Sequence, residues 1–327
     1  MPINSPRPRA TLWSRLARRT IAGLALGMTL GMTLSTAHAA GSILFIGNSF
    51  TYAWGSAVRF YRADTVTDLN NQGIGGVPAL FKSFTQQAGL SYDVFLETQP
   101  GSGIDWHLDN KLGTLGQRPW DTVVMHGYST LDPKKPGDAT VLTSTVRQMA
   151  DFLRARNPAV DLRLMATWPR ADQTYEAKGA WFGKPIEAMA RDVRSGYDQA
   201  AAGTPGIKGV VPVGEAWVRA MQTGVADDNP YDGIAAGKLN LWTYDGYHAS
   251  AHGYYLEALV LFGSLTGRDP RSLGDLECSG FELGFSPAQV GALQQVAYDQ
   301  LAAAGPITAA PLKLAKPAEP NRCVRPR

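Results

Sequence analysis

The sequence predicts an α/β fold in which helices cover both faces of a parallel sheet. Five short apolar segments alternate with longer segments whose apolar residues recur at helical spacing. The first apolar segment, 43–46, is hydrophobic at every position, as in strands that are buried on both faces. Gly47 follows it directly and permits a sharp turn at the end of this strand.

The predicted elements follow one another in regular order along the chain. Strands are expected at 43–46, 94–96, 120–125, 162–166 and 210–213. Helices are expected at 78–88, 140–156, 185–202, 215–223, 251–265 and 287–304. Residues 52–77 lack periodicity and are rich in turn-forming residues, so we expect a long loop there that borders the functional site.

Residues 1–39 have the features of a secretory signal peptide. Five arginines and no acidic residue accompany an apolar run at 21–34, and an A-x-A pattern follows at 37–39. The run is too short for a stable membrane span. We therefore expect cleavage near Ala39 and a secreted or periplasmic protein. The arginine pair at 18–19 leaves twin-arginine export open beside the ordinary secretory route.

The charge of the exported chain gives no reason to expect a nucleic-acid partner. The whole sequence has 31 Lys and Arg against 28 Asp and Glu. Removing the five arginines of the signal segment leaves 26 against 28, and no run of basic residues remains.

The exported chain is long enough for one domain, predicted over 40–305, with a Pro-rich tail over 306–327. Its two cysteines are Cys278 and Cys323. An even pair in an oxidising compartment predicts a disulfide that ties the tail to the domain.

Three residues could form a nucleophilic site. Ser49 follows the first predicted strand, and Asp245 and His248 lie three positions apart before a predicted helix. A histidine can accept the proton of a serine hydroxyl while a carboxylate holds its other ring nitrogen. Taken singly, Ser49 also fits a helix cap, and Asp245 a turn with Gly246. In a parallel α/β sheet, however, the loops that follow different strands meet at one edge.

These residues resemble the motifs of the SGNH/GDSL hydrolase superfamily. The first block reads Gly47-Asn48-Ser49-Phe50-Thr51, as in the branch with G-N-S-F-T, and the last block reads Asp245-Gly246-Tyr247-His248. The resemblance spans about residues 42–270, and its middle is weaker than its ends. It implies a flavodoxin-like three-layer α/β/α esterase with Ser49 as nucleophile, oriented by the Asp245–His248 pair, and with no cofactor and no metal.

The resemblance also implies an oxyanion hole, in which Ser49, a glycine and an asparagine each donate a hydrogen bond. Gly101 is the first choice for the glycine and Gly103 the second, because both follow the second strand. No asparagine follows the third strand. His126 or Ser129 would have to donate in its place, and the sequence does not decide between them.

Several further residues are candidates for the substrate pocket. They are aromatic or histidine side chains in or near loops at the predicted strand ends, namely Trp106, His107, Tyr128, Trp168 and Tyr247. Pockets for small molecules are commonly apolar and aromatic, but ordinary packing explains such residues equally well.

We therefore expect a serine esterase that cleaves carboxylic esters of small molecules or carbohydrates, with short acyl groups such as acetyl preferred. The alternative is a glycan-binding protein that has the fold without the activity, which the missing asparagine suggests. No nucleic acid and no membrane span is expected.

Overall fold

The computed structural model describes residues 41–305 and residue 323. The predicted signal segment, 1–39, therefore lies outside the described residues, as does the predicted tail except for Cys323. The described residues belong to one compact unit of the chain. None of their helices is long and apolar enough to cross a membrane.

The centre of this unit is a parallel sheet with the strand order β2-β3-β1-β4-β5-β6. The strands are β1 Gly41–Gly47, β2 Thr67–Asp68, β3 Tyr92–Thr98, β4 Thr122–Met125, β5 Asp161–Ala166 and β6 Ile207–Pro212. The sheet has six strands where five were predicted, because the two-residue β2 pairs with β3 at one edge. Two residues carry no periodicity, so the sequence of this predicted loop does not reveal the strand.

The six predicted helices are present, five of them with shifted ends and 287–304 with the predicted ends, and four short helices were not predicted. The helices are α1 Gly76–Gln87, α2 Ile104–Asn110, α3 Leu112–Leu115, α4 Thr140–Arg154, α5 Ala171–Tyr175, α6 Ile186–Ala202, α7 Val213–Gln222, α8 Ala251–Thr266, α9 Cys278–Glu282 and α10 Pro287–Ala304. Short 3₁₀ helices cover Ala57–Phe60, Ala63–Thr65 and Pro270–Leu273. The missed helices have seven residues or fewer, which is too short for an amphipathic pattern.

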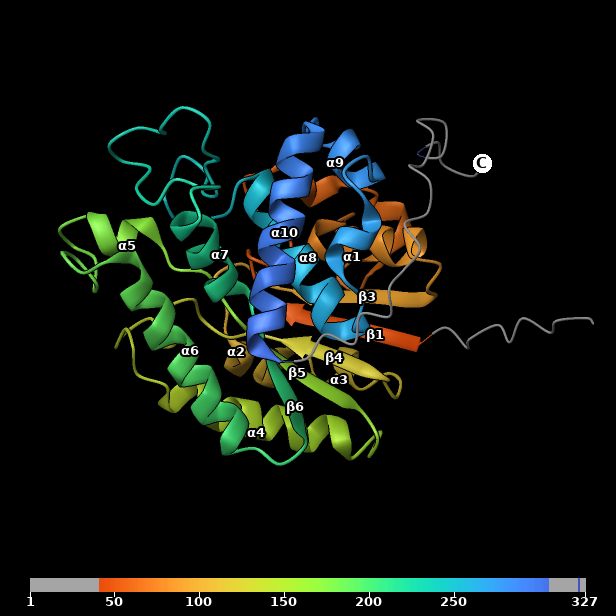
Figure 1. Cartoon of the computed structure of the whole chain (residues 1–327). Helices are drawn as coiled ribbons and strands as arrows, with labels where there is room; N and C mark the ends of the chain where they lie inside the picture. The colour runs from red at the N-terminus through yellow and green to blue at the C-terminus, as the bar shows by residue number, and fades with distance from the viewer. Residues whose placement is uncertain (1–40, 306–322, 324–327) are drawn as a thin grey trace, which may run out of the picture. The chain divides into compact units, whose positions relative to one another are not determined.

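Helices cover both faces of the sheet, which confirms the predicted three-layer α/β/α architecture (Figure 1). Side chains of β1 alternate between the two layers: Ile43 and Phe45 join the core beneath α1, α7, α8 and α10. Leu44 and Ile46 join the core beneath α2, α4 and α6. All four side chains are buried, as the uninterrupted apolar run predicts.

The strand register brings several loops to one edge of the sheet. Gly47 at the end of β1 pairs with Thr98 of β3, and Ile46 pairs with Met125 of β4. Without the short β2, the order is β3-β1-β4-β5-β6, that of a doubly wound sheet. The chain places β3 on one side of β1 and the later strands β4, β5 and β6 on the other side. The loop after β1 therefore emerges where the connections diverge, which is where such folds bind ligands.

The predicted disulfide between Cys278 and Cys323 is confirmed. Cys278 is the first residue of α9 and is buried. The bond closes a loop of 45 positions and ties residue 323 to the helical layer that contains α1 and α10.

Candidate active site

Ser49 and His248 meet at the carboxyl edge of the sheet although 199 positions separate them. The Ser49 Oγ lies 3.0 Å from the His248 Nε2, and the His248 Nδ1 lies 2.7 Å from the Asp245 Oδ2. Ser49 and His248 are buried, and the Asp245 side chain is 23 % exposed. The three groups thus form a connected line from a hydroxyl through an imidazole to a carboxylate.

The loop that carries Asp245 and His248 is held by its own hydrogen bonds. The Asp245 Oδ1 accepts from the backbone N–H of Tyr247 and of His248, both at 2.9 Å. The same oxygen accepts from the Thr243 hydroxyl at 2.7 Å. Gly246 adopts a positive φ of 61°, which a side chain would make costly. One oxygen of the carboxylate therefore shapes the loop and leaves the other for the imidazole.

These contacts set the protonation of the pair. Burial alone would raise the pKa of Asp245, but the hydrogen bonds from His248, Thr243 and the loop backbone outweigh it and lower the pKa below its ordinary value. Burial lowers the pKa of His248, and Asp245 opposes that shift. The carboxylate is therefore ionised and the imidazole neutral near pH 7, the state in which the ring can accept a proton.

The turn that carries Ser49 is fixed by its neighbours. A side chain at Gly47 would collide with Thr51 and His126, so only glycine fits there. The Asn48 side chain accepts from the Phe50 N–H at 3.1 Å and donates to the Ser102 carbonyl at 2.9 Å. Asn48 was not singled out from the sequence, although it lies inside the first motif. It connects the loop after β1 to the loop after β3.

The glycines predicted for the oxyanion hole differ in their surroundings. Gly101 has a φ of 65° and lies exposed in the loop after β3. Among the described turns and loops, the N–H groups of Ser49 and Gly101 donate to no backbone carbonyl. The Gly103 N–H instead faces the Tyr128 hydroxyl: burial and Asp105 raise the pKa of Tyr128, and this N–H only partly opposes them. Gly101 is thus the glycine with the freer donor.

His126 is not free to donate, which corrects the prediction for this residue. Its Nε2 lies 2.9 Å from the Thr51 Oγ, and its Nδ1 lies 3.0 Å from the Gly127 carbonyl. A carbonyl only accepts, so these partners assign the proton to Nδ1 and leave Nε2 to accept from Thr51. Burial lowers the pKa of His126 to about 4, so the ring stays neutral. Neither nitrogen has a proton left for a substrate.

Ser129, the other candidate, contacts a charged group that the sequence did not reveal. The Ser129 Oγ accepts from Arg170 at 3.1 Å, which leaves its own hydroxyl proton free. Arg170 also forms an ion pair with Asp172 and stacks 3.5 Å above the Tyr247 ring. The charge of Arg170 acts on His248, whose pKa it lowers after the larger effect of burial.

Two of the residues predicted for the pocket are in the core instead. Trp168 has no exposed surface because it stacks between Phe50 and Trp217, with ring centroids 3.7 Å and 4.9 Å away. His107 likewise has no exposed surface. Both residues follow strands and were therefore predicted to lie in loops at the site. The chain at these positions instead turns back into the core.

Other aromatic residues do reach the surface beside the site. Tyr247 is partly exposed, and its ring lies 4.1 Å from the His248 ring. Trp54 lies 4.4 Å from the His248 ring on its own loop, and the neighbouring Tyr244 is 88 % exposed. Trp54 confirms that the start of the 52–77 segment borders this site. Trp106 and Tyr128 are also partly exposed, on the loops that follow β3 and β4.

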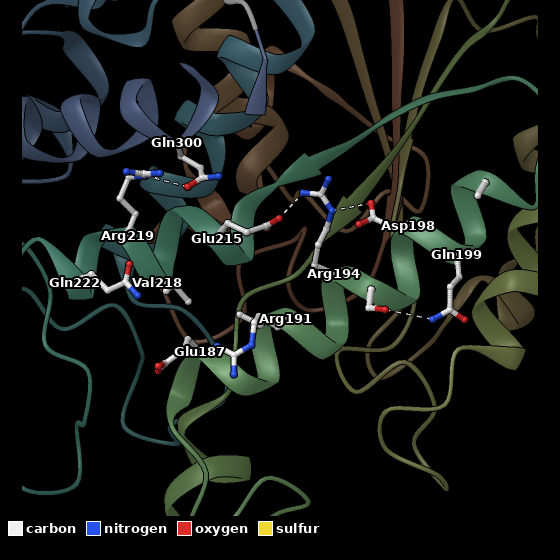
Figure 2. Close-up of a pocket in the computed structure, with 13 residues that line it drawn as sticks. Glu187, Arg191, Arg194, Asp198, Gln199, Glu215, Val218, Arg219, Gln222 and Gln300 are labelled. Carbon is white, nitrogen blue, oxygen red and sulfur yellow. Dashed lines mark hydrogen bonds and ion pairs between the residues drawn. The ribbon is translucent and has the colours of Figure 1, made fainter. Parts of the chain in front are cut away.

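A separate groove of about 730 Å³ lies between α6, α7 and α10 (Figure 2). Arg194 reaches from α6 to Glu215 on α7 across this groove and also pairs with Asp198 (Figure 2). Neither Ser49 nor His248 lines it. In the described part of the chain, no group of three or more histidine, cysteine or acidic side chains is placed to hold a metal ion.

No protein-family model and no curated protein matches the chain. Among solved structures, a DUF4886 family protein from Bacteroides uniformis matches with a TM-score of 0.56 and 18 % identity, covering 83 % of this chain and 98 % of that one. This match shows a shared fold. A candidate SGNH hydrolase from Slackia heliotrinireducens matches with a TM-score of 0.48 and 22 % identity, over 69 % and 99 % of the two chains. A family 3 carbohydrate esterase from Clostridium thermocellum matches with a TM-score of 0.44 and 18 % identity, over 68 % and 94 %.

Proposed function

We propose that the protein is a serine esterase that works through an acyl-enzyme intermediate. The observation that carries the proposal is the unbroken line of hydrogen bonds from Ser49 through His248 to Asp245. A serine hydroxyl is a weak nucleophile unless a base within hydrogen-bond reach removes its proton. The neutral state of His248 and the ionised state of Asp245 supply that base and its orienting group.

The reaction follows from these assignments. The Ser49 Oγ attacks the ester carbonyl while the His248 Nε2 takes its proton, and the C–O bond to the alcohol then breaks as His248 protonates the leaving oxygen. A water molecule, deprotonated by the same nitrogen, then attacks the acyl carbonyl; the C–O bond to the Ser49 Oγ breaks as His248 returns the proton to that oxygen, and the acid is released. Asp245 accepts from the His248 Nδ1–H, which leaves Nε2 without a proton and facing Ser49 before the attack, and it stabilises the imidazolium in both steps.

We assign the oxyanion hole to three donors: the N–H groups of Ser49 and Gly101 and the hydroxyl of Ser129. The two N–H groups have no carbonyl partner among the described turns and loops. Ser129 takes the place predicted for an asparagine, because its hydroxyl proton is free while Arg170 donates to its oxygen. Each donor aimed at the developing charge contributes about 3–4 kcal/mol of barrier reduction.

The motifs around Ser49 and His248 resemble those of SGNH hydrolases, which supports the same reaction class. The substrates we propose are short-chain esters, with acetyl groups on carbohydrates preferred. Two features support this choice. Trp54 and the exposed Tyr244 form an aromatic surface beside His248, against which the apolar face of a sugar ring could pack. The predicted signal peptide would bring the protein to extracellular polysaccharides.

A panel of p-nitrophenyl esters, run beside acetylated xylan and other acetylated polysaccharides, tests the proposal. We expect hydrolysis to decline from acetate to longer acyl chains, and acetate to be released from at least one polysaccharide. Ser49→Ala should remove both activities while retaining binding to the polysaccharide. Polysaccharide binding without any hydrolysis by the wild-type protein would identify the glycan-binding alternative instead.

A further inference from the structure

A second histidine–carboxylate pair lies wholly inside the protein, below the proposed site. Glu97 belongs to β3 and His107 to α2, and neither has any exposed surface. The Glu97 Oε2 faces the His107 Nδ1 in an ion pair. The Glu97 Oε1 accepts from the Asn70 amide at 3.1 Å and lies 3.6 Å from the Lys111 Nζ. The proposed reaction uses none of these groups.

The other nitrogen of His107 points at the backbone next to the nucleophile. Its Nε2 lies 3.0 Å from the Gly47 carbonyl and 3.3 Å from the Ser102 Oγ. A carbonyl oxygen only accepts, so we assign a proton to Nε2 from its partner. Burial alone would raise the pKa of Glu97, but the hydrogen bond and charge of His107 outweigh it and lower the pKa. Both partners only accept, so both ring nitrogens carry a proton: Nδ1–H donates to the Glu97 carboxylate, and Nε2–H donates to the Gly47 carbonyl.

The two residues that His107 contacts, Gly47 and Ser102, lie next to the two proposed reactive groups, Ser49 and the Gly101 N–H. Gly47 precedes Asn48 and Ser49, and its carbonyl also accepts from the Gln99 N–H at 3.1 Å. Ser102 directly follows Gly101, and its own carbonyl accepts from the Asn48 amide. His107 therefore joins the nucleophile turn to the loop that carries the Gly101 N–H.

We propose that His107, held by Glu97, is a positioning residue that sets the spacing between Ser49 and the Gly101 N–H. The inference rests on the proposed function. Stability alone does not account for such a pair, because apolar residues of similar volume commonly replace a buried ion pair at no cost. What the pair adds is direction: Glu97 orients the ring so that one N–H is aimed at Gly47. A displacement of about 1 Å between reacting groups can slow a reaction about 100-fold.

Two amide substitutions of nearly equal size separate positioning from simple packing. In His107→Gln, the side-chain amide nitrogen reaches the place of Nε2 and can still donate to Gly47. In His107→Asn, it reaches only the place of Nδ1 and can bond to Glu97 alone. The measurement is the burst and steady-state hydrolysis of p-nitrophenyl acetate, with each rate divided by the concentration of sites that react with a fluorophosphonate.

We expect His107→Asn to lower kcat per reactive site about 10- to 100-fold with little change in KM, and His107→Gln to stay within about threefold of wild type. Asn48→Ala cuts the same connection at Ser102 without changing the buried pair. It should also lower kcat more than KM, so the test stands if the asparagine variant at 107 does not fold.

Glu277→Gln is the matched control, because Glu277 is another buried carboxylate. Its side-chain partners, Tyr255 on α8 and Gln87 on α1, lie outside the loops that carry Ser49 and Gly101. It should lower Tm and leave kcat per reactive site unchanged. Equal kcat in the two variants at 107, or losses in all variants that only follow Tm, would overturn the positioning role and leave the esterase proposal standing. A wild-type protein that neither hydrolyses the ester nor reacts with the fluorophosphonate would overturn both.

Discussion

The two histidine–carboxylate pairs of this protein have similar internal geometry and opposite surroundings. In both, a carboxylate holds the Nδ1 of the ring and the Nε2 points at an oxygen of the segment 47–49, at 3.0 Å in each case. The Nε2 of His248 faces the Ser49 hydroxyl, at a site flanked by surface aromatics. The Nε2 of His107 faces a carbonyl in the interior.

The partner oxygen decides what each pair can do. A hydroxyl can give up a proton, so His248 can act as a base. A carbonyl has no proton to give, so His107 can only hold it in place. A histidine–carboxylate pair alone therefore does not identify a catalytic group. The atom that faces the Nε2 must also be a group that can give up a proton.

The largest effect should follow from breaking the His248 line. Ser49→Ala and His248→Ala should each lower kcat about 10⁴- to 10⁶-fold, and the double variant should lose little more, because the two groups act as one unit. Pre-steady-state hydrolysis of p-nitrophenyl acetate measures this. Losses that multiply in the double variant would contradict the proposed hydrogen-bonded unit.

A smaller loss should follow from Asp245→Asn, about 10⁴-fold in kcat, because an amide cannot stabilise the imidazolium and favours the wrong ring tautomer. Circular dichroism should remain that of wild type. A variant at full activity would show that His248 needs no carboxylate to orient it. The comparison with the Glu97–His107 pair, in which a carboxylate orients the ring, would then fail.

Ser129→Ala tests the third oxyanion donor and should lower kcat about 100-fold with a smaller change in KM. His126→Asn is the comparison at the same loop. Because His126 has no free N–H, this substitution should reduce stability more than turnover per reactive site. A larger loss of kcat at 126 than at 129 would return the role to His126.

A smaller effect on activity should be a shift of the pH profile. Arg170 lowers the pKa of His248, so Arg170→Gln should raise it and move the acid limb of kcat/KM to higher pH. The charge of Asp172, which pairs with Arg170, also raises the pKa of His248 and would no longer be neutralised in this variant. Lys178→Gln removes an exposed lysine and should leave the limb in place. A shift to lower pH would contradict the assigned sign.

Removing the disulfide should change stability and leave the chemistry intact. For the 45-position loop between Cys278 and Cys323, the chain-entropy estimate is about 4 kcal/mol of unfolding free energy. Cys278→Ser with Cys323→Ser should therefore lower Tm and keep kcat unchanged, as measured by thermal unfolding and ester hydrolysis. Loss of kcat at full folding would place the disulfide in the functional machinery.

The sequence predicted the sheet and the longer helices because their signals are local. The apolar run at 43–46 and the helical spacing at 140–156 depend only on neighbouring residues. The two-residue β2 and the short α5 have no such pattern, and tertiary contacts form them. Arg170 precedes α5, so the charge that acts on His248 was missed together with that helix.

The site was predicted in part for the same reason. Ser49, Asp245 and His248 belong to short motifs with fixed spacing, and the parallel sheet brings those motifs together. The burial of Trp168 and of His107 depends on how distant elements pack, which sequence spacing does not encode. The Glu97 partner of His107 lies ten positions earlier on a strand, where nothing local connects the two.

The most direct test of the account is to find which residue a fluorophosphonate modifies. Treated wild-type protein should gain the mass of one adduct, and peptide mapping should place it on Ser49. His248→Ala should react far more slowly, while His107→Gln should react nearly as fast as wild type. An adduct on another residue, or no adduct in a protein that hydrolyses esters, would contradict the central claim.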